Sequence, residues 1–299
     1  MPLIIASDAC RIIDPSSSEY QSAIEEHERF LKSYHTEALS KNARFEELSN
    51  EILAPLSKII ESDDNSRGAL LKLRSEDLFE PDELLGSRSD QELNDDFRIV
   101  PKELVYAKTP PYDPRGATKG VTQNSKQPYS SFNDTRNGYV GIDARSGALS
   151  GGADGFVSAF SGFAFAFGSV RTGHLISGAH IESGRFAYNV GCRGIGGYAT
   201  AEGGWQMTVL QLSPLPVRLV TASSYTQWRR RVSGFETAHD LQENLRFGVA
   251  TTRFAVNQNY IYSVAANLYS FSDRSAGVGA AAAQSLGQGL ITALFANGY

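Results

Sequence analysis

Residues 155–169, GFVSAFSGFAFAFGS, decide the class of fold. Phe163, Phe165 and Phe167 alternate with two alanines in this stretch. Because successive side chains on a β-strand point to opposite faces, the three rings form one aromatic row with only methyl groups behind it. Both faces of the strand are then apolar. The stretch therefore predicts a strand that is buried inside a packed, two-layer β core.

Two further aromatic residues of the same stretch, Phe156 and Phe160, have the opposite parity. Gly162 lies between the two sets and predicts a β-bulge, which would turn both sets of rings toward the interior. A strand without a bulge, with aromatic rings on both faces, is the alternative.

The period of two continues from residue 138 to the end of the chain. Strands are predicted at residues 139–143, 155–169, 185–192, 205–209, 217–221, 246–256, 260–271 and 290–296. Gly-rich turns separate them, and little helical pattern lies between. The chain from residue 138 therefore predicts an antiparallel β-sandwich of the jelly-roll type with about eight strands, and a barrel is the alternative.

The N-terminal part has a different, helical pattern. Residues 16–62 begin with Ser16 and Glu19, which match the spacing of a capping box. Apolar residues then recur at spacings of three, four and seven, at Ile24, Leu31, Ala38, Phe45, Leu48, Ile52, Leu56 and Ile59. This stripe must bury against a partner. The rest of the same chain is one partner, and a second copy is the other, which would make residues 16–62 an arm for homo-oligomerisation.

These patterns divide the chain into three parts. Residues 1–106 form a helical, acidic N-terminal region with short helices after residue 62. Residues 107–137 are rich in Pro, Gly, Ser and Asn and predict an extended linker. Residues 138–299 form the β-sandwich domain, and within it residues 276–289 predict a Gly/Ala loop before the last strand.

Composition narrows the classes of partner. The chain has 299 residues and a net charge of −5, with a pI near 5.6, which argues against nucleic acid as the partner. Residues 276–295 carry no charge but are only weakly apolar, so membrane contact is an alternative that the sequence does not favour. The first residues show no secretory signal peptide, which predicts a cytoplasmic protein or release by a non-classical route. Cys10 and Cys192 make no paired motif, and reduced thiols are favoured over one disulfide.

A basic patch is the predicted ligand-binding site. Arg229 and Arg231 share one face of a strand, and guanidinium groups suit carboxylates or phosphates. Trp228 could stack on a sugar ring, and Tyr225 adds an aromatic side chain of the kind common at interfaces. An exposed strand edge protected by charge is the alternative interpretation, and a salt bridge between subunits is a third.

Histidine and carboxylate spacing gives a second candidate site. His174, His180 and Glu182 would suit zinc or iron if the segment crossed a turn. Residues 194–199 match the pattern G-x-G-x-x-A, but a strand follows instead of the helix that a dinucleotide requires. These glycines predict a sharp bend between strands, and no cofactor is predicted.

Three functions remain open. The leading hypothesis is a non-enzymatic recognition or assembly protein whose sandwich binds a ligand, a glycan or a partner protein. The second is a membrane-active, pore-forming, toxin-like protein, against which the two-faced apolar strand at Phe163–Phe167 argues. The third is a jelly-roll enzyme with a metal at His174, His180 and Glu182.

Overall fold

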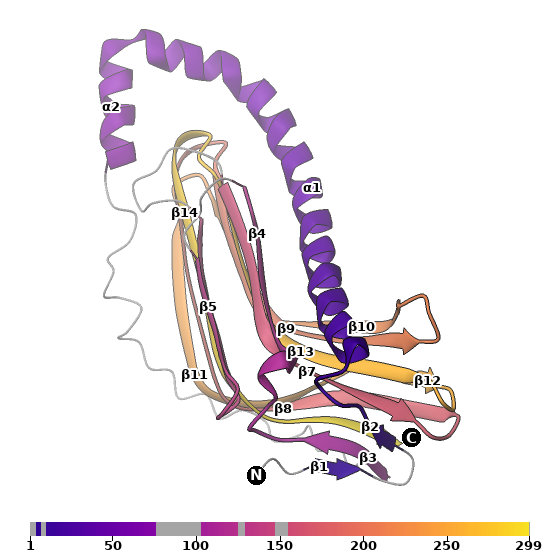
Figure 1. Ribbon diagram of the computed structural model, residues 1–299. Coiled ribbons are helices and arrows are strands. Elements are labelled where there is room, and N and C mark those ends of the chain that lie inside the picture. The colour runs from indigo at the N-terminus through magenta and orange to yellow at the C-terminus, as the bar shows by residue number, and fades with distance from the viewer. Residues whose placement is uncertain (1–3, 7–9, 76–102, 125–128, 147–154, 299) are drawn as a thin grey trace.

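The protein is a two-layer antiparallel β-sandwich with one long helix along it (Figure 1). The computed structural model describes residues 4–6, 10–75, 103–124, 129–146 and 155–298. Both the sandwich and the helical N-terminal part agree with the fold class that the sequence predicts. No helix within these ranges combines the length and apolar character of a membrane span.

One sheet, sheet A, is built around the last strand of the described chain. Its strands are β1 (Ile4–Ala6), β3 (Glu103–Lys108), β5 (Tyr129–Asp134), β6 (Tyr139–Ser146), β8 (Gly173–Ile195), β11 (Thr237–Ala250), β12 (Phe254–Val256) and β14 (Val278–Gly298). β14 pairs with β8 along one side and with β3 and β6 along the other. β11 and β12 pair with the far side of β8. All these pairs are antiparallel.

The other sheet, sheet B, carries the aromatic strand. Its strands are β2 (Cys10–Ile12), β4 (Ala117–Gln123), β7 (Gly155–Ser169), β9 (Tyr198–Ser213), β10 (Arg218–Ser233) and β13 (Ile261–Ser275). They lie in the order β10, β9, β13, β7, and the outer side of β7 pairs with β4 and β2 in turn. β10 is therefore an edge strand in the described part of sheet B. All eight predicted strands have counterparts. β7 has the predicted limits of 155–169, the predicted strand 246–256 is divided between the end of β11 and β12, and the other six differ from their predicted limits.

The predicted aromatic row lies on the inner face of β7. Phe163, Phe165 and Phe167 are all buried there. The ring centroid of Phe163 lies 4.4 Å from that of Tyr112, and the ring centroid of Phe165 lies 4.7 Å from that of Tyr106. Offset aromatic packing of this kind stabilises a core beyond the area that it buries. Burial of both faces of β7 is thus confirmed.

The bulge predicted at Gly162 is wrong. β7 pairs with β13 without any shift of register, and Gly162 lies directly opposite Asn267. Gly162 is needed for a different reason, because a Cβ atom there would lie 2.0 Å from the carbonyl oxygen of Ala266. Phe160 therefore stays on the outer face, where it packs with Leu31 of the long helix.

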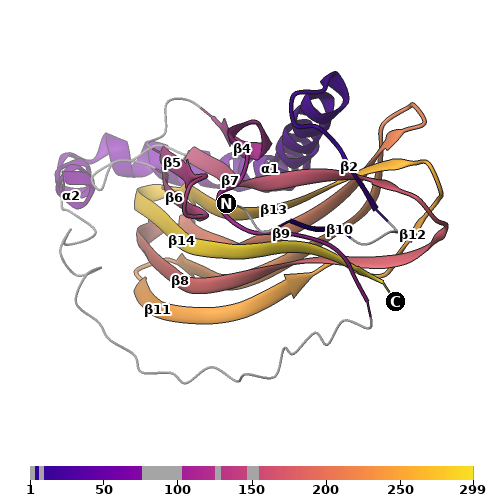
Figure 2. The ribbon, with the colours of Figure 1, turned by 60° about the horizontal axis from the view of Figure 1, so that its bottom comes forward.

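Helix α1 (Ser18–Ser62) covers the outer face of sheet B with its first half (Figure 2). Ser17, one residue after the predicted cap, caps the helix by accepting a hydrogen bond of 3.2 Å from the backbone N–H of Tyr20. The buried stripe is Tyr20, Ala23, Ile24, His27 and Leu31. Burial of this stripe within the same chain supports the intrachain alternative for this half of the helix.

The predicted stripe is not buried along the whole helix. Ile59 is 66% exposed, and α1 arches away from the strands toward α2 (Asp64–Ser75) (Figure 1). The side chains of Ala38, Phe45, Leu48, Ile52 and Leu56 lie outside the described part of the structure. Homo-oligomerisation through residues 16–62 stays a prediction.

Two predicted coil segments are strands. The predicted linker at 107–137 contains the end of β3 and all of β4 and β5, which pair with strands of the sandwich. Residues 278–289, in the predicted Gly/Ala loop, form the first half of β14. The Pro, Gly, Ser and Ala content of these segments wrongly predicted coil. Strand pairing depends on backbone N–H and C=O groups, which every residue type except proline supplies in full. The bend predicted at 194–199 is present, and Gly196 has a φ of 74° between β8 and β9.

Candidate ligand-binding cleft

One end of the sandwich carries a cleft between the two sheets. Four connections meet at this end, at 170–172, 214–217, 251–253 and 257–260 (Figures 1 and 2). The cleft has a volume of about 390 Å³, which is in the usual range for small-ligand sites. The residues that matter most for its chemistry are Gln211, Arg218, Val220, Arg253, Asn257 and Tyr262. We refer to it as the arginine cleft.

A β-bulge shapes the wall that β10 contributes. The pairing of β10 with β9 shifts between Leu219 and Thr221, so Val220 packs against the core. Beside it, the hydroxyl groups of Thr221 and Thr252 are 2.9 Å apart and join β10 to the turn before β12. Phe254, which is buried, adds an apolar wall. A bulge near a sheet edge commonly redirects side chains in this way.

Gln211 orients the guanidinium group of Arg218. The Oε1 atom of Gln211 accepts hydrogen bonds from Nε and Nη2 of Arg218, at 2.9 and 2.6 Å. The Nε2 atom of Gln211 donates to the carbonyl oxygen of Pro214, at 3.2 Å, which fixes the amide. Gln211 is 3% exposed and neutral. It therefore holds the guanidinium through Nε and Nη2 without neutralising its charge.

Tyr262 presents a neutral phenol to the cleft. Its hydroxyl oxygen accepts a hydrogen bond of 2.9 Å from the backbone N–H of Asn257. Burial raises the pKa of Tyr262 above its ordinary value. Tyr262 is almost fully buried, whereas Asn257 is exposed and its side-chain amide gives the cleft a polar group suited to hydroxyl or carboxylate oxygens.

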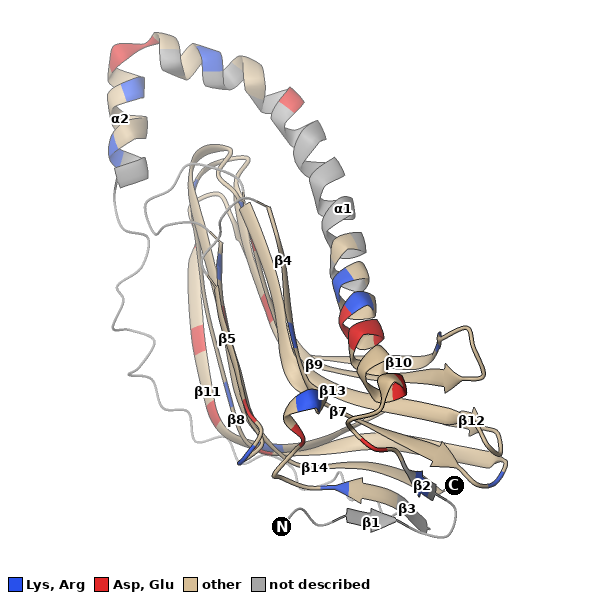
Figure 3. Ribbon diagram, viewed as in Figure 1, with Lys and Arg blue, Asp and Glu red and all other residues tan. Residues whose placement is uncertain are grey.

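The charge at this end differs from the charge of the whole chain. Segments 169–174, 213–219 and 251–260 contain Arg171, Arg218 and Arg253 and no Asp or Glu, although the chain has a net charge of −5 (Figure 3). The described residues that line the arginine cleft likewise include two arginines and no carboxylate. The cleft therefore favours an anionic group.

A second cavity lies on the other side of the same part of β10. Its volume is about 250 Å³, and Arg218 and Leu219 line both cavities. Helix α1 supplies Glu26, Arg29, Phe30 and Ser33 to its wall, and the strand side includes Leu210 and Val217. We refer to it as the helix cavity.

His27 fixes α1 beside the helix cavity. Its Nε2 and Nδ1 atoms lie 2.9 Å from the hydroxyl of Ser263 and 2.8 Å from the hydroxyl of Thr208. Ser263 donates its own proton to the carbonyl oxygen of Phe165, at 3.2 Å, so its oxygen accepts from Nε2–H. Thr208 then donates to Nδ1. Burial lowers the pKa of His27 to about 3, which keeps the ring neutral.

The structure separates the four side chains of the predicted ligand site. Trp228 lies inside the sandwich, where its indole stacks on Phe186 at 4.6 Å and its N–H donates to Ser285 at 3.1 Å. The hydroxyl group of Tyr225 is bonded to the backbone of Ala250. Trp228 and Tyr225 therefore hold the two sheets together and do not face solvent beside the arginines.

Arg229 and Arg231 do share the outer face of β10, as predicted. Nε of Arg229 lies 3.4 Å from a carboxylate oxygen of Glu202. The guanidinium carbon of Arg231 lies 4.1 Å from the centre of the Tyr198 ring, within the range of a cation–π interaction. Both cations thus have a partner within the sheet, in contrast to the neutral amide that holds Arg218.

The structure does not bring the three predicted metal ligands together. All three lie along β8, where His180 is bonded to Thr292 at 2.7 Å and Glu182 lies 3.5 Å from Arg246. His174 is six residues from His180, about 20 Å along a strand. No group of three potential metal ligands occurs among the residues whose placement is described. Of the cysteines, Cys192 is a buried free thiol, and the side chain of Cys10 lies outside the described residues.

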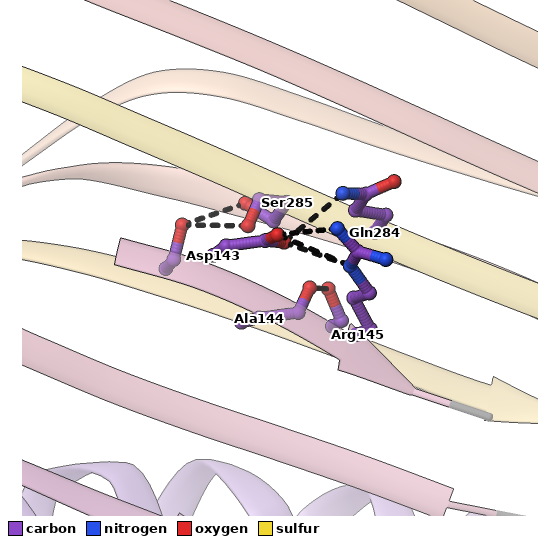
Figure 4. Close-up of polar contacts among 7 residues, drawn as sticks. Asp143, Ala144, Arg145, Gln284 and Ser285 are labelled. Carbon is purple, nitrogen blue, oxygen red and sulfur yellow. Dashed lines mark hydrogen bonds and ion pairs between the residues drawn. The ribbon is translucent and has the colours of Figure 1, made fainter. Parts of the chain in front are cut away.

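A polar cluster on the outer face of sheet A is self-contained (Figure 4). Asp143 accepts hydrogen bonds from Nη2 of Arg145 at 2.7 Å and from Nε2 of Gln284 at 3.0 Å. The charges of the carboxylate and guanidinium groups compensate each other. This cluster therefore ties β6 to β14 and offers less charge to a ligand than Arg218 does.

Sequence reasoning missed Arg218, Arg253 and Gln211. Gln211 and Arg218 lie on either side of the turn between β9 and β10, whereas Arg253 lies far later in the chain, and no short motif includes all three. The sequence pattern gave no signal for the two arginines, because Arg218 and Arg253 lie within segments that it predicts as strands, 217–221 and 246–256. Only the fold shows that these segments meet at one end.

No protein-family model matches the chain, and no curated protein matches it. A solved structure with limited similarity is that of the carbohydrate-binding module TmCBM61 in complex with β-1,4-galactotriose. The match has 11% sequence identity and a TM-score of 0.19, and it covers 60% of this chain and 88% of that chain. A likeness this weak carries no argument about the ligand of the present chain.

Proposed function

We propose that the protein is a non-enzymatic binding protein and that its arginine cleft holds an acidic glycan. The observation that carries the proposal is the geometry of Arg218, whose guanidinium group is held by the neutral amide of Gln211. A guanidinium group oriented in this way is well suited to a carboxylate. The ligand would supply the negative charge that Gln211 lacks.

The remaining lining suits the rest of a sugar ring. Asn257 and Thr252 offer hydrogen-bonding groups for ring hydroxyls, and Val220 and Phe254 offer apolar contact for its carbon atoms. The described lining includes no Asp, Glu or His, so it lacks the carboxylate pair that most glycoside hydrolases use. Recognition without catalysis is therefore the proposal that fits the cleft best.

Titration calorimetry with galacturonate and with its methyl ester would test the proposal, because the two sugars differ only in the charged group. We expect the acid to bind and the ester to bind at least about tenfold more weakly. Arg218→Gln should remove this preference. Gln211→Glu should also remove it, because the new carboxylate would pair with Arg218 and take the place of the ligand.

Arg229→Gln is the matched control, because Arg229 is an arginine of the same strand on the predicted patch. It should leave the affinity for galacturonate unchanged. If Arg229→Gln weakened binding while Arg218→Gln did not, the ligand site would lie at Arg229 and Arg231 instead. If the acid and the ester bound equally, the proposed role of the charge would be contradicted.

A further inference from the structure

The arginine cleft and the helix cavity meet on one short piece of strand. Arg218 and Leu219 line both, and they are the first two residues of β10. Leu219 is 43% exposed, and β10 is an edge strand in the described part of sheet B. A ligand that fills one cavity can therefore continue into the other by crossing β10.

The lining of the helix cavity suits a second ring of a chain-like ligand. Phe30 offers an aromatic side chain, and Leu210 and Val217 lie on the strand side of the cavity. Glu26 and Arg29 form an ion pair with each other, and Ser33 is exposed. The cavity thus combines apolar contact with polar groups that can meet hydroxyls.

Helix geometry explains why these residues face the cavity. Glu26, Arg29, Phe30 and Ser33 recur at spacings of three and four, so they lie along one side of α1. This side is adjacent to the buried stripe at Ala23, His27 and Leu31. Because His27 is bonded to both β9 and β13, the rotation of α1 about its axis is fixed. The side that carries Phe30 is therefore held over the cavity.

We infer that the ligand is an extended acidic oligosaccharide, with one charged unit in the arginine cleft and the next unit against α1. The inference rests on the proposed function and specifies its ligand. It assigns a binding role to α1, whose first half would otherwise serve only to cover sheet B. Longer ligands gain affinity at such a site because the second unit binds without a further loss of translational freedom.

The test compares galacturonate with trigalacturonate by titration calorimetry on the full chain. We expect the trimer to bind at least about tenfold more tightly than the monomer. Phe30→Ala should abolish most of this gain and leave monomer affinity within about twofold. Ser33→Asp should do the same, because it adds a carboxylate that repels the second acidic unit. Ser33 is exposed, so this variant keeps the test decisive if Phe30→Ala fails to fold.

Phe235→Ala is the matched control, because Phe235 is 72% exposed on the turn between β10 and β11, away from both cavities. It should leave both affinities unchanged. A trimer that binds no more tightly than the monomer would overturn the inference and leave the proposed function standing. Unchanged trimer binding in Ser33→Asp would also overturn it. Absence of monomer and trimer binding would overturn both proposals.

Discussion

His27 joins α1 to two strands of sheet B through a single imidazole ring. The ring is buried and neutral, and both nitrogen atoms are bonded to hydroxyl groups of Thr208 and Ser263. Both of these hydrogen-bond partners are neutral, so neither would compensate the positive charge of a protonated ring. Protonation is therefore opposed by the native structure and favoured by the unfolded chain, which makes His27 a source of pH-dependent stability.

The sign of this effect follows from the pKa values. The pKa of His27 is about 3 in the folded protein, and the ordinary value is 6.5. Below pH 6.5 the unfolded state binds a proton that the folded state does not, so stability falls as the pH falls toward 3. We expect His27 alone to cost about 2 kcal/mol between pH 7 and pH 5. Urea unfolding of the wild type and of His27→Gln at both pH values would measure it, since the variant should lack this part of the slope. Equal slopes would contradict the assignment.

The distance between α1 and sheet B depends on small residues in the strands beneath the helix. Ala164 and Ala166 of β7 and Ala265 of β13 lie under the buried stripe of the helix. The hydroxyl group of Tyr20 donates to the carbonyl oxygen of Ala164 at 2.9 Å. On its outer side, β7 pairs with β4 up to Phe163 and with β2 from Phe167 onward, so Ala164 lies in the gap between the two described strands. The helix therefore supplies the hydrogen bond that this backbone carbonyl does not receive from β4 or β2.

Enlarging one of these alanines should loosen the helix. Ala166→Leu would place a larger side chain between α1 and β7, and overpacking of this kind typically costs about 1–3 kcal/mol. Thermal and urea unfolding would measure the loss. Ala222→Leu, at an exposed position on β10, is the matched control and should change stability by less than about 0.5 kcal/mol. A similar loss of stability in both variants would contradict specific packing of α1 against Ala166.

The limits of sequence reasoning are clearest at this scale. The row of Phe163, Phe165 and Phe167 was predictable because large and small side chains still alternate with a period of two when both faces of the strand are buried. The outward direction of Phe160 was not, because the period does not reveal that a helix much earlier in the chain covers the second face. β4 and β5 were missed because edge strands are held by backbone pairing, which leaves little mark on composition. The arginine cleft needed the complete fold, since its residues come from the ends of four strands and from the connections beside β12.

At the scale of the whole molecule, the interior of the sandwich changes along its length. One part is packed with aromatic rings, including Tyr106 and Tyr262. The other part has small side chains such as Ala201 and Ala283, together with serines that cross between the sheets. Ser285 of β14 accepts from the indole N–H of Trp228 and donates to the carbonyl oxygen of Glu202, at 3.1 and 2.9 Å. The two sheets are thus joined by polar bonds where the rings end.

Removing this hydroxyl group should weaken the whole sandwich. Ser285→Ala would leave the buried indole N–H of Trp228 without its acceptor, which we expect to cost about 1–3 kcal/mol. Global unfolding followed by tryptophan fluorescence and by circular dichroism would measure the loss in one transition. Ser130→Ala, on the exposed edge strand β5, should have little effect. If the two serine variants had the same free energy of unfolding, the hydrogen bond to Trp228 would make no measurable contribution to stability.

The central position of β14 also has a consequence for biosynthesis. This strand is the last of the described chain to leave the ribosome, yet it pairs with β3, β6 and β8. Until it emerges, sheet A exists at most as separate pieces whose edges have unpaired backbone groups, and such edges invite association with other nascent chains. Sheet A can therefore be completed only after β14 has followed the strands that it joins. The cell has to protect those edges during that interval.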